Sequence, residues 1–171
     1  MELPLHPKIV HLPIALAVLM PLLTSGLLLA IWRDWFPRRV WTIAVVGSLL
    51  LVGSGVLALR SGEADEERVE RFVPEAALER HEEAAERFVW ASALLLGLSL
   101  APLLLGNPRA RLLGQAATVA ASGVVLALGF AVGQAGGELV YGHNGAAAFT
   151  ARSEGQGPAV VPDGRAHDDE R

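Results

Sequence analysis

The chain has 171 residues, of which 52% are hydrophobic and only 19% are charged, and its formal net charge is −4. This composition is too apolar for an ordinary soluble domain. The absence of cysteine excludes disulfides, iron–sulfur clusters, thiolate-bound haem and thiol catalysis. No basic patch of the kind that binds nucleic acid is present.

Charged residues are missing from four long runs, at 9–32, 40–59, 88–106 and 112–137. About 20 helical residues cross the hydrocarbon core of a bilayer, so each run is long enough to span it. We therefore predict an all-α integral membrane protein, a four-helix bundle made of two hairpins. The predicted domain covers residues 1–150, with spans at about 9–32, 40–59, 88–106 and 112–135. The first run is too long for a cleaved signal, so we expect it to remain as a span.

The loops between paired spans are short and rich in arginine, RDWFPRR at 33–39 and NPRAR at 107–111. The positive-inside rule places both loops in the cytoplasm. Both termini and the segment 60–87 then lie on the non-cytoplasmic side of a bacterial inner membrane. Within the third span, Ala93, Gly97 and Ala101 form a ladder of small residues typical of close helix packing.

The third span has a predicted helical extension, because PEAALERHEEAAERF runs into it from Pro74 without a helix breaker. At helical spacing His81 shares a stripe with Ala77, Ala84 and Phe88, while the glutamates fall on the opposite face. His81 is therefore predicted to face the bundle.

Three other histidines lie near the same membrane face. His6 and His11 precede or open the first span, and His143 follows the fourth span beside Tyr141, a residue typical of the membrane interface. Ionisable residues at membrane depth are costly, which favours a site. Imidazole is a common ligand of haem iron, copper and zinc. The tail at 151–171, which contains His167, is polar, and we expect it to be disordered.

The segments LHPKIVHLPIAL and GGELVYGHNGAA resemble the two signatures of a bacterial membrane family, the domain of unknown function twenty-two thirty-one. The resemblance extends over about residues 3–150. It implies four spans. It also implies that the protein works beside electron-transfer proteins, because related domains are sometimes joined to Rieske or cytochrome c modules. The matching positions are His6, Pro7, Val10, His11, Pro13, His81, Gly136, Gly137, Leu139, Val140, Tyr141 and Gly145.

The function we expect is that of a small membrane redox protein that binds b-type haem near the non-cytoplasmic face. His11 and His81 are the expected axial ligands, with His6 or His143 as substitute or supporting partner and Tyr141 beside them. Electrons would pass between quinone and an external acceptor such as a cytochrome c or Rieske-type protein. No independent enzyme activity is expected.

Two alternatives stay open. The same histidines would suit a copper or zinc site, with the acidic segment before the third span attracting cations. The chain would otherwise be a non-catalytic structural subunit whose histidines and small residues only pack. The bilayer is the expected partner in every case, and assembly as a homo-oligomer is compatible with all three.

Overall fold

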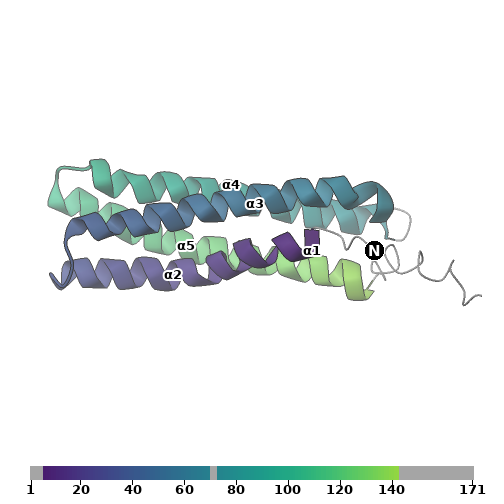
Figure 1. Cartoon of the computed structure of the whole chain (residues 1–171), viewed down its shortest axis with the longest axis horizontal. Helices are drawn as coiled ribbons and strands as arrows, with labels where there is room; N and C mark the ends of the chain where they lie inside the picture. Colours follow the sequence, from purple (N-terminus) through teal and green to yellow (C-terminus); the bar gives the residue numbers. More distant parts are fainter. Residues whose placement is uncertain (1–5, 70–72, 143–171) are drawn as a thin grey trace, which may run out of the picture.

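The computed structural model describes residues 6–69 and 73–142. Within these ranges the chain is helical and contains no strand. α2, α3, α4 and α5 run along one axis as a bundle (Figure 1), and each is long and apolar enough to cross a membrane. The predicted all-α bundle of two hairpins is confirmed. In chain order the elements are α1 (His6–Ile9), α2 (His11–Trp32), η1 (Arg38–Trp41), α3 (Thr42–Val69), α4 (Glu75–Leu104), α5 (Pro108–Gly137) and the π-helical turn η2 (Glu138–Gly142).

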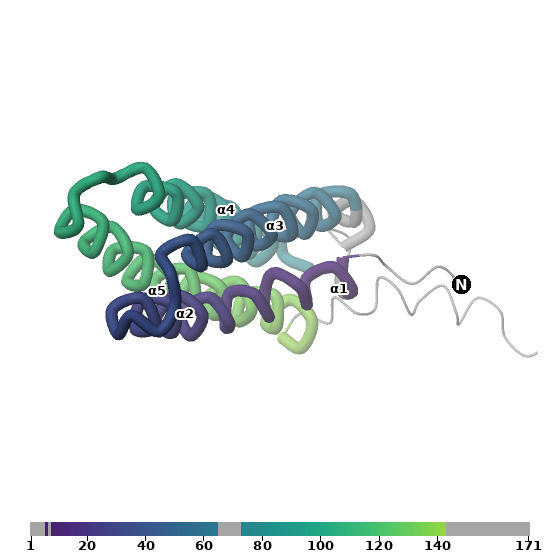
Figure 2. The backbone as a smooth tube through the Cα atoms, turned by 60° about the vertical axis from the view of Figure 1, so that its left-hand side comes forward, coloured from purple at the N-terminus to yellow at the C-terminus, as the bar shows by residue number. Residues whose placement is uncertain are grey.

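The two ends of the bundle differ in their chemistry. At one end η1, between α2 and α3, carries Arg38 and Arg39, and the first turn of α5 carries Arg111; we call it the arginine end. At the other end α1 and the start of α4 carry His6 and His81, and we call it the histidine end. Figure 2 shows the connections from α2 to α3 and from α4 to α5 at the same end, far from α1.

The helices pack in a ring, each against two neighbours, in the order α2, α3, α4, α5 and back to α2. The core contains Met20, Leu51, Leu95 and Val125, together with Phe88. Two glycines lie against the Phe88 ring, since a Cβ at Gly55 or Gly129 would touch it at 3.4 Å. Small residues at such crossings let helices approach closely in lipid.

Buried hydroxyl and indole groups join the helices. Thr24 and Ser122 share a hydrogen bond of 3.2 Å between α2 and α5. The indole Nε1 of Trp41 donates to the carbonyl oxygen of Ser99 at 3.0 Å. The predicted ladder in α4 is not the buried stripe of this helix, since Gly97 is exposed whereas Ser92, Leu95 and Ser99 are buried.

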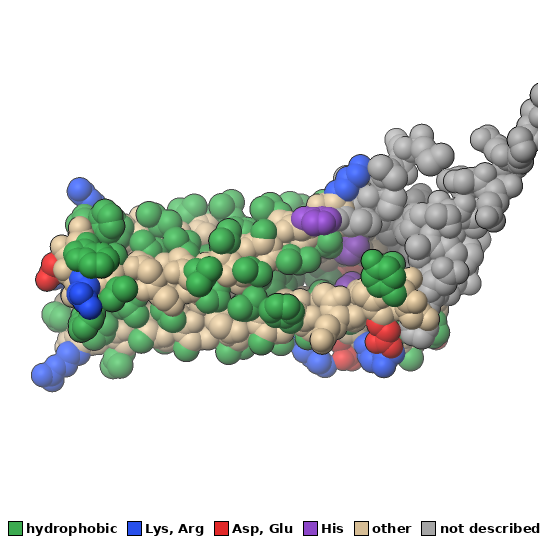
Figure 3. All heavy atoms as spheres, turned by 90° about the horizontal axis from the view of Figure 1, so that it is seen from below, with side chains coloured by type: hydrophobic (Ala, Val, Ile, Leu, Met, Phe, Trp, Pro, Cys, Tyr) green, Lys and Arg blue, Asp and Glu red, His purple; other side chains and the backbone are tan. Residues whose placement is uncertain are grey.

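On the face seen in Figure 3, hydrophobic side chains cover the length of the bundle and the described charges gather towards its two ends. Leu22, Trp90 and Leu113 each expose 70% or more of their surface, as expected of side chains that face lipid. The segment 60–87 contains more helix than predicted, because α3 continues to Val69 before α4 begins at Glu75. Alanine, glutamate and arginine favour helix, and no proline interrupts α3. The predicted tail at 151–171 lies outside the described residues.

Candidate functional site

His6 is held by the C-terminal half of α3, and its hydrogen bonds define which ring nitrogen is free. Its Nδ1 lies 3.0 Å from the carbonyl oxygen of Ala58 and 3.0 Å from the hydroxyl oxygen of Ser61. A carbonyl oxygen only accepts hydrogen bonds, so Nδ1 carries the proton and donates it. The Ser61 hydroxyl donates to the same carbonyl at 2.8 Å. In the tautomer with the proton on Nδ1, the unshared lone pair is on Nε2.

His81 comes from α4 and faces into the bundle, as its position in the helical stripe predicts. Ala77 is 3% exposed and Phe88 is 7% exposed on the same face, whereas Glu79 and Glu83 on the other face are exposed. The Nδ1 atom of His81 is buried and has no hydrogen-bond partner among the described residues. A buried polar atom without a partner costs free energy, which makes this nitrogen a candidate ligand atom.

The two imidazoles face each other across the histidine end. Their ring centroids are 6.3 Å apart and their planes meet at 89°. We call His6 and His81 the imidazole pair. Each ring lies against a glycine of another helix: a Cβ at Gly62 would lie 3.2 Å from His6, and a Cβ at Gly136 would lie 3.1 Å from His81. These glycines leave room for the rings on α3 and α5.

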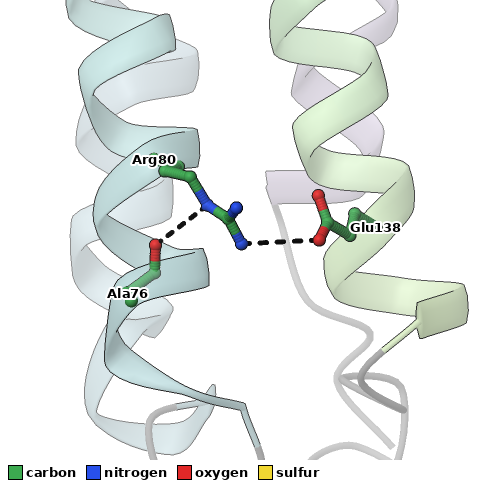
Figure 4. A network of polar contacts seen from close by, with 3 residues as sticks. All are labelled: Ala76, Arg80 and Glu138. Carbon is green, nitrogen blue, oxygen red and sulfur yellow. Dashed lines mark hydrogen bonds and ion pairs between the residues drawn. The ribbon is translucent and has the colours of Figure 1, made fainter.

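The turn η2 anchors the α5 side of the site to α4. Leu139 is buried in a small apolar cluster with Val73 and Ala77. Figure 4 shows the polar link beside it, in which Arg80 bridges to Glu138 at 3.4 Å and donates from Nε to its own helix. Both side chains are more than half exposed, so this ion pair contributes little stability. The apolar contact is the stronger support for the position of Gly136.

The other predicted site residues are placed differently. His11 is exposed at the start of α2, and its imidazole forms no hydrogen bond or ring contact within residues 6–69 and 73–142. Tyr141 is 90% exposed, which fits an interfacial position better than contact with the imidazole pair. His143 lies outside the described residues. The bundle therefore brings His6, rather than His11, to His81.

The supporting groups were not found from the sequence. Ser61 and Gly62 follow the second apolar run and carry no distinguishing pattern, and a backbone carbonyl such as that of Ala58 leaves no trace in a sequence. Gly136 belongs to the GGELVY segment, but its position beside an imidazole depends on the packing of α4 on α5.

Across the described part of the chain, no group of three or more His, Cys, Asp or Glu side chains could hold a metal ion.

Comparison with known proteins agrees with this architecture. Residues 2–148 match the family described as "Predicted membrane protein (DUF2231)". No curated protein and no solved structure matches the chain. The family match covers both hairpins and both members of the imidazole pair. The chain therefore belongs to the DUF2231 family of membrane proteins.

Proposed function

We propose that this protein is a membrane electron carrier that binds b-type haem between His6 and His81. The observation that carries the proposal is the imidazole pair itself, with one ring oriented by a carbonyl and the other presenting a buried nitrogen without a partner. Histidines that bind metals commonly donate their second ring nitrogen to a carbonyl or carboxylate, which fixes the tautomer. The hydrogen bond from His6 to Ala58 has this form.

The separation of the rings supports a shared metal. A metal–nitrogen bond is about 2 Å long. Two such bonds and half the width of each imidazole add up to roughly the distance between the two ring centroids. The observed distance between the ring centroids is 6.3 Å. The rings lie edge to face, so they would have to turn until one nitrogen of each faced the iron atom.

The number of ligands favours haem over a bare metal ion. Structural zinc sites use four protein ligands and catalytic zinc sites use three. A porphyrin supplies four ligands itself, so haem iron needs only the two axial positions from the protein. The described residues provide two imidazoles at this end and no third metal-binding side chain beside them. Copper or zinc remains the second candidate, with His143 as a further ligand.

The chain's own residues would orient and insulate the site. Ala58 and Ser61 hold the His6 ring, and the core residue Phe88 lies about two helical turns from His81 on the same face of α4. Bound haem would supply a one-electron iron couple, and its apolar surroundings would tune the potential. The arginine end lies in the cytoplasm by the positive-inside rule, so the site is on the other side of a bacterial inner membrane. Electrons would pass between quinone and an external cytochrome c or Rieske-type acceptor.

The test is the cofactor content of protein purified in detergent from cells supplied with a haem precursor. We expect a Soret band, sharp α and β bands after reduction with dithionite, and about one iron per chain. The double variant His6→Ala/His81→Ala should lose these bands while keeping its helical circular dichroism. If the wild-type protein is colourless and contains copper or zinc, the site binds that metal and not haem. A colourless protein without metal would favour a structural subunit.

A further inference from the structure

A second candidate site lies at the opposite end of the bundle. Two adjoining cavities open at the arginine end, with volumes of about 500 Å³ and about 240 Å³. The larger lies between the end of α2, the connection to η1 and the start of α5. The smaller lies between η1, the end of α4 and the start of α5. Arg38, Arg111 and Gln115 line both cavities, so these three side chains stand where the cavities meet.

Gln115 is the buried member of this group. It is 3% exposed, and its side-chain amide forms no hydrogen bond with any residue of the described part of the chain. The amide atoms are not among the described polar atoms that are fully buried without a partner, so they keep some accessible surface at the cavities. A ligand that supplies an oxygen acceptor gives this amide a hydrogen-bond partner. The amide lines both cavities and is therefore available to such a ligand.

The charges around the cavities favour an anion. Arg38 and Arg111 line both cavities and Arg39 lines the smaller one, whereas Asp34 is the single acidic side chain in either lining. None of these arginines forms an ion pair with a described carboxylate. The guanidinium group presents a planar fork of donors that matches phosphate oxygens.

The remaining lining of the larger cavity is mainly apolar. Leu28, Ile31 and Leu112 line the larger cavity together with the aromatic rings of Trp32 and Phe36. Trp32 and Phe36 are also 65% and 57% exposed, as aromatic residues at a membrane interface usually are. A ligand for this site is therefore anionic at one end and apolar at the other.

We propose that the arginine end binds one anionic phospholipid of the adjacent leaflet. Its phosphate lies between Arg38 and Arg111, and the amide of Gln115 donates to a headgroup oxygen. An acyl chain covers Leu28 and Ile31. Basic pockets between transmembrane helices are known to select anionic headgroups. A quinone fits less well, because a neutral ring does not require two guanidinium groups.

The full-length protein in detergent micelles provides the test, with bound lipid counted by native mass spectrometry. Dioleoylphosphatidylglycerol should bind at least about tenfold more tightly than dioleoylphosphatidylcholine. Arg38→Gln and Arg111→Gln should each weaken phosphatidylglycerol binding about tenfold, the loss expected for one charge-assisted hydrogen bond. Arg109→Gln is the matched control, since Arg109 is exposed on the same helix and lines neither cavity. It should bind like the wild type.

Three results would overturn the proposal. Equal losses of phosphatidylglycerol affinity in Arg109→Gln and Arg111→Gln would show that general surface charge, and not a specific site, accounts for the binding. Displacement of phosphatidylglycerol by millimolar inorganic phosphate would make free phosphate the ligand. Tight binding of decylubiquinone that survives both arginine changes would make the cavity a quinone site. If the glutamine variants do not fold, Arg38→Lys and Arg111→Lys replace them. Lysine keeps the positive charge but lacks the planar guanidinium group, so these variants should still bind phosphatidylglycerol more weakly.

Discussion

The imidazole of His6 lies edge to face with the imidazole of His81, with a centroid distance of 6.3 Å. One ring comes from the turn ahead of the first span, and the other comes from the helical extension ahead of the third span. Neither segment alone can assemble the pair. Ala58 and Ser61 in the C-terminal half of α3 hold one ring, and Gly136 of α5 makes room for the other. Four elements thus meet at one small site.

The hydroxyl of Ser61 contributes to the orientation of His6. Ser61→Ala removes its contact with Nδ1 and leaves only the Ala58 carbonyl as partner. Loss of such a supporting group commonly lowers metal affinity by about tenfold or more. We expect this loss in an absorbance titration with haemin. Ser54→Ala is the control, because Ser54 is buried in the same helix and bonds only to Leu51. An unchanged affinity in Ser61→Ala would remove Ser61 from the site.

The glycine beside His81 should not tolerate a side chain. A Cβ at Gly136 would lie 3.1 Å from the His81 ring, whereas a Cβ at Gly133 of the same helix meets nothing within 4 Å. Gly136→Ala should lower the free energy of unfolding by about 1–3 kcal/mol through overpacking. Gly133→Ala should be neutral or stabilise by up to about 1 kcal/mol, because alanine favours helix. Thermal unfolding in detergent compares the two, and equal melting temperatures would contradict this packing.

The buried indole of Trp41 should stabilise the arginine end. It is 1% exposed and donates to the Ser99 carbonyl at 3.0 Å, so Trp41→Phe loses a hydrogen bond and leaves a gap. We expect a loss of about 2 kcal/mol in the free energy of unfolding. Trp90→Phe is the matched control, because Trp90 is 75% exposed on the lipid-facing surface. A larger loss of unfolding free energy in Trp90→Phe than in Trp41→Phe would show that the packing faces of the helices are assigned wrongly.

The orientation in the membrane can be measured directly, because the chain contains no native cysteine. Arg109→Cys reports on the arginine end and Glu79→Cys reports on the histidine end, and both positions are exposed. In intact spheroplasts a membrane-impermeant maleimide should label Glu79→Cys, and should label Arg109→Cys only after lysis. The reverse pattern would place the imidazole pair in the cytoplasm.

The spans and the inward position of His81 could be predicted because both depend on local patterns. A run of about 20 residues without a charged side chain identifies a span. Helical spacing separates Ala77 and His81 from the exposed glutamates. The partner of His81 could not be predicted. His6 and His11 both lie at the entrance of the first span, and only the break between α1 and α2 directs one of them to α3.

The packing face of α4 shows a second limit of sequence patterns. The ladder of Ala93, Gly97 and Ala101 has the spacing of an interface, yet the neighbouring stripe of Ser92, Leu95 and Ser99 is the buried one. Small apolar residues cost little when they face lipid, so their spacing alone does not identify an interface. Serine hydroxyls bonded to their own helix carbonyls are equally compact and pack as well.

The central claim is that His6 and His81 together hold one haem iron, and a haemin titration of the purified apoprotein tests it most directly. Wild-type protein and His11→Ala should bind one haemin per chain with similar affinity and the same low-spin spectrum, because His11 is exposed and apart from the pair. His6→Ala and His81→Ala should each lose that spectrum. If His11→Ala loses it while His6→Ala keeps it, the iron is held by a different pair and the account is wrong.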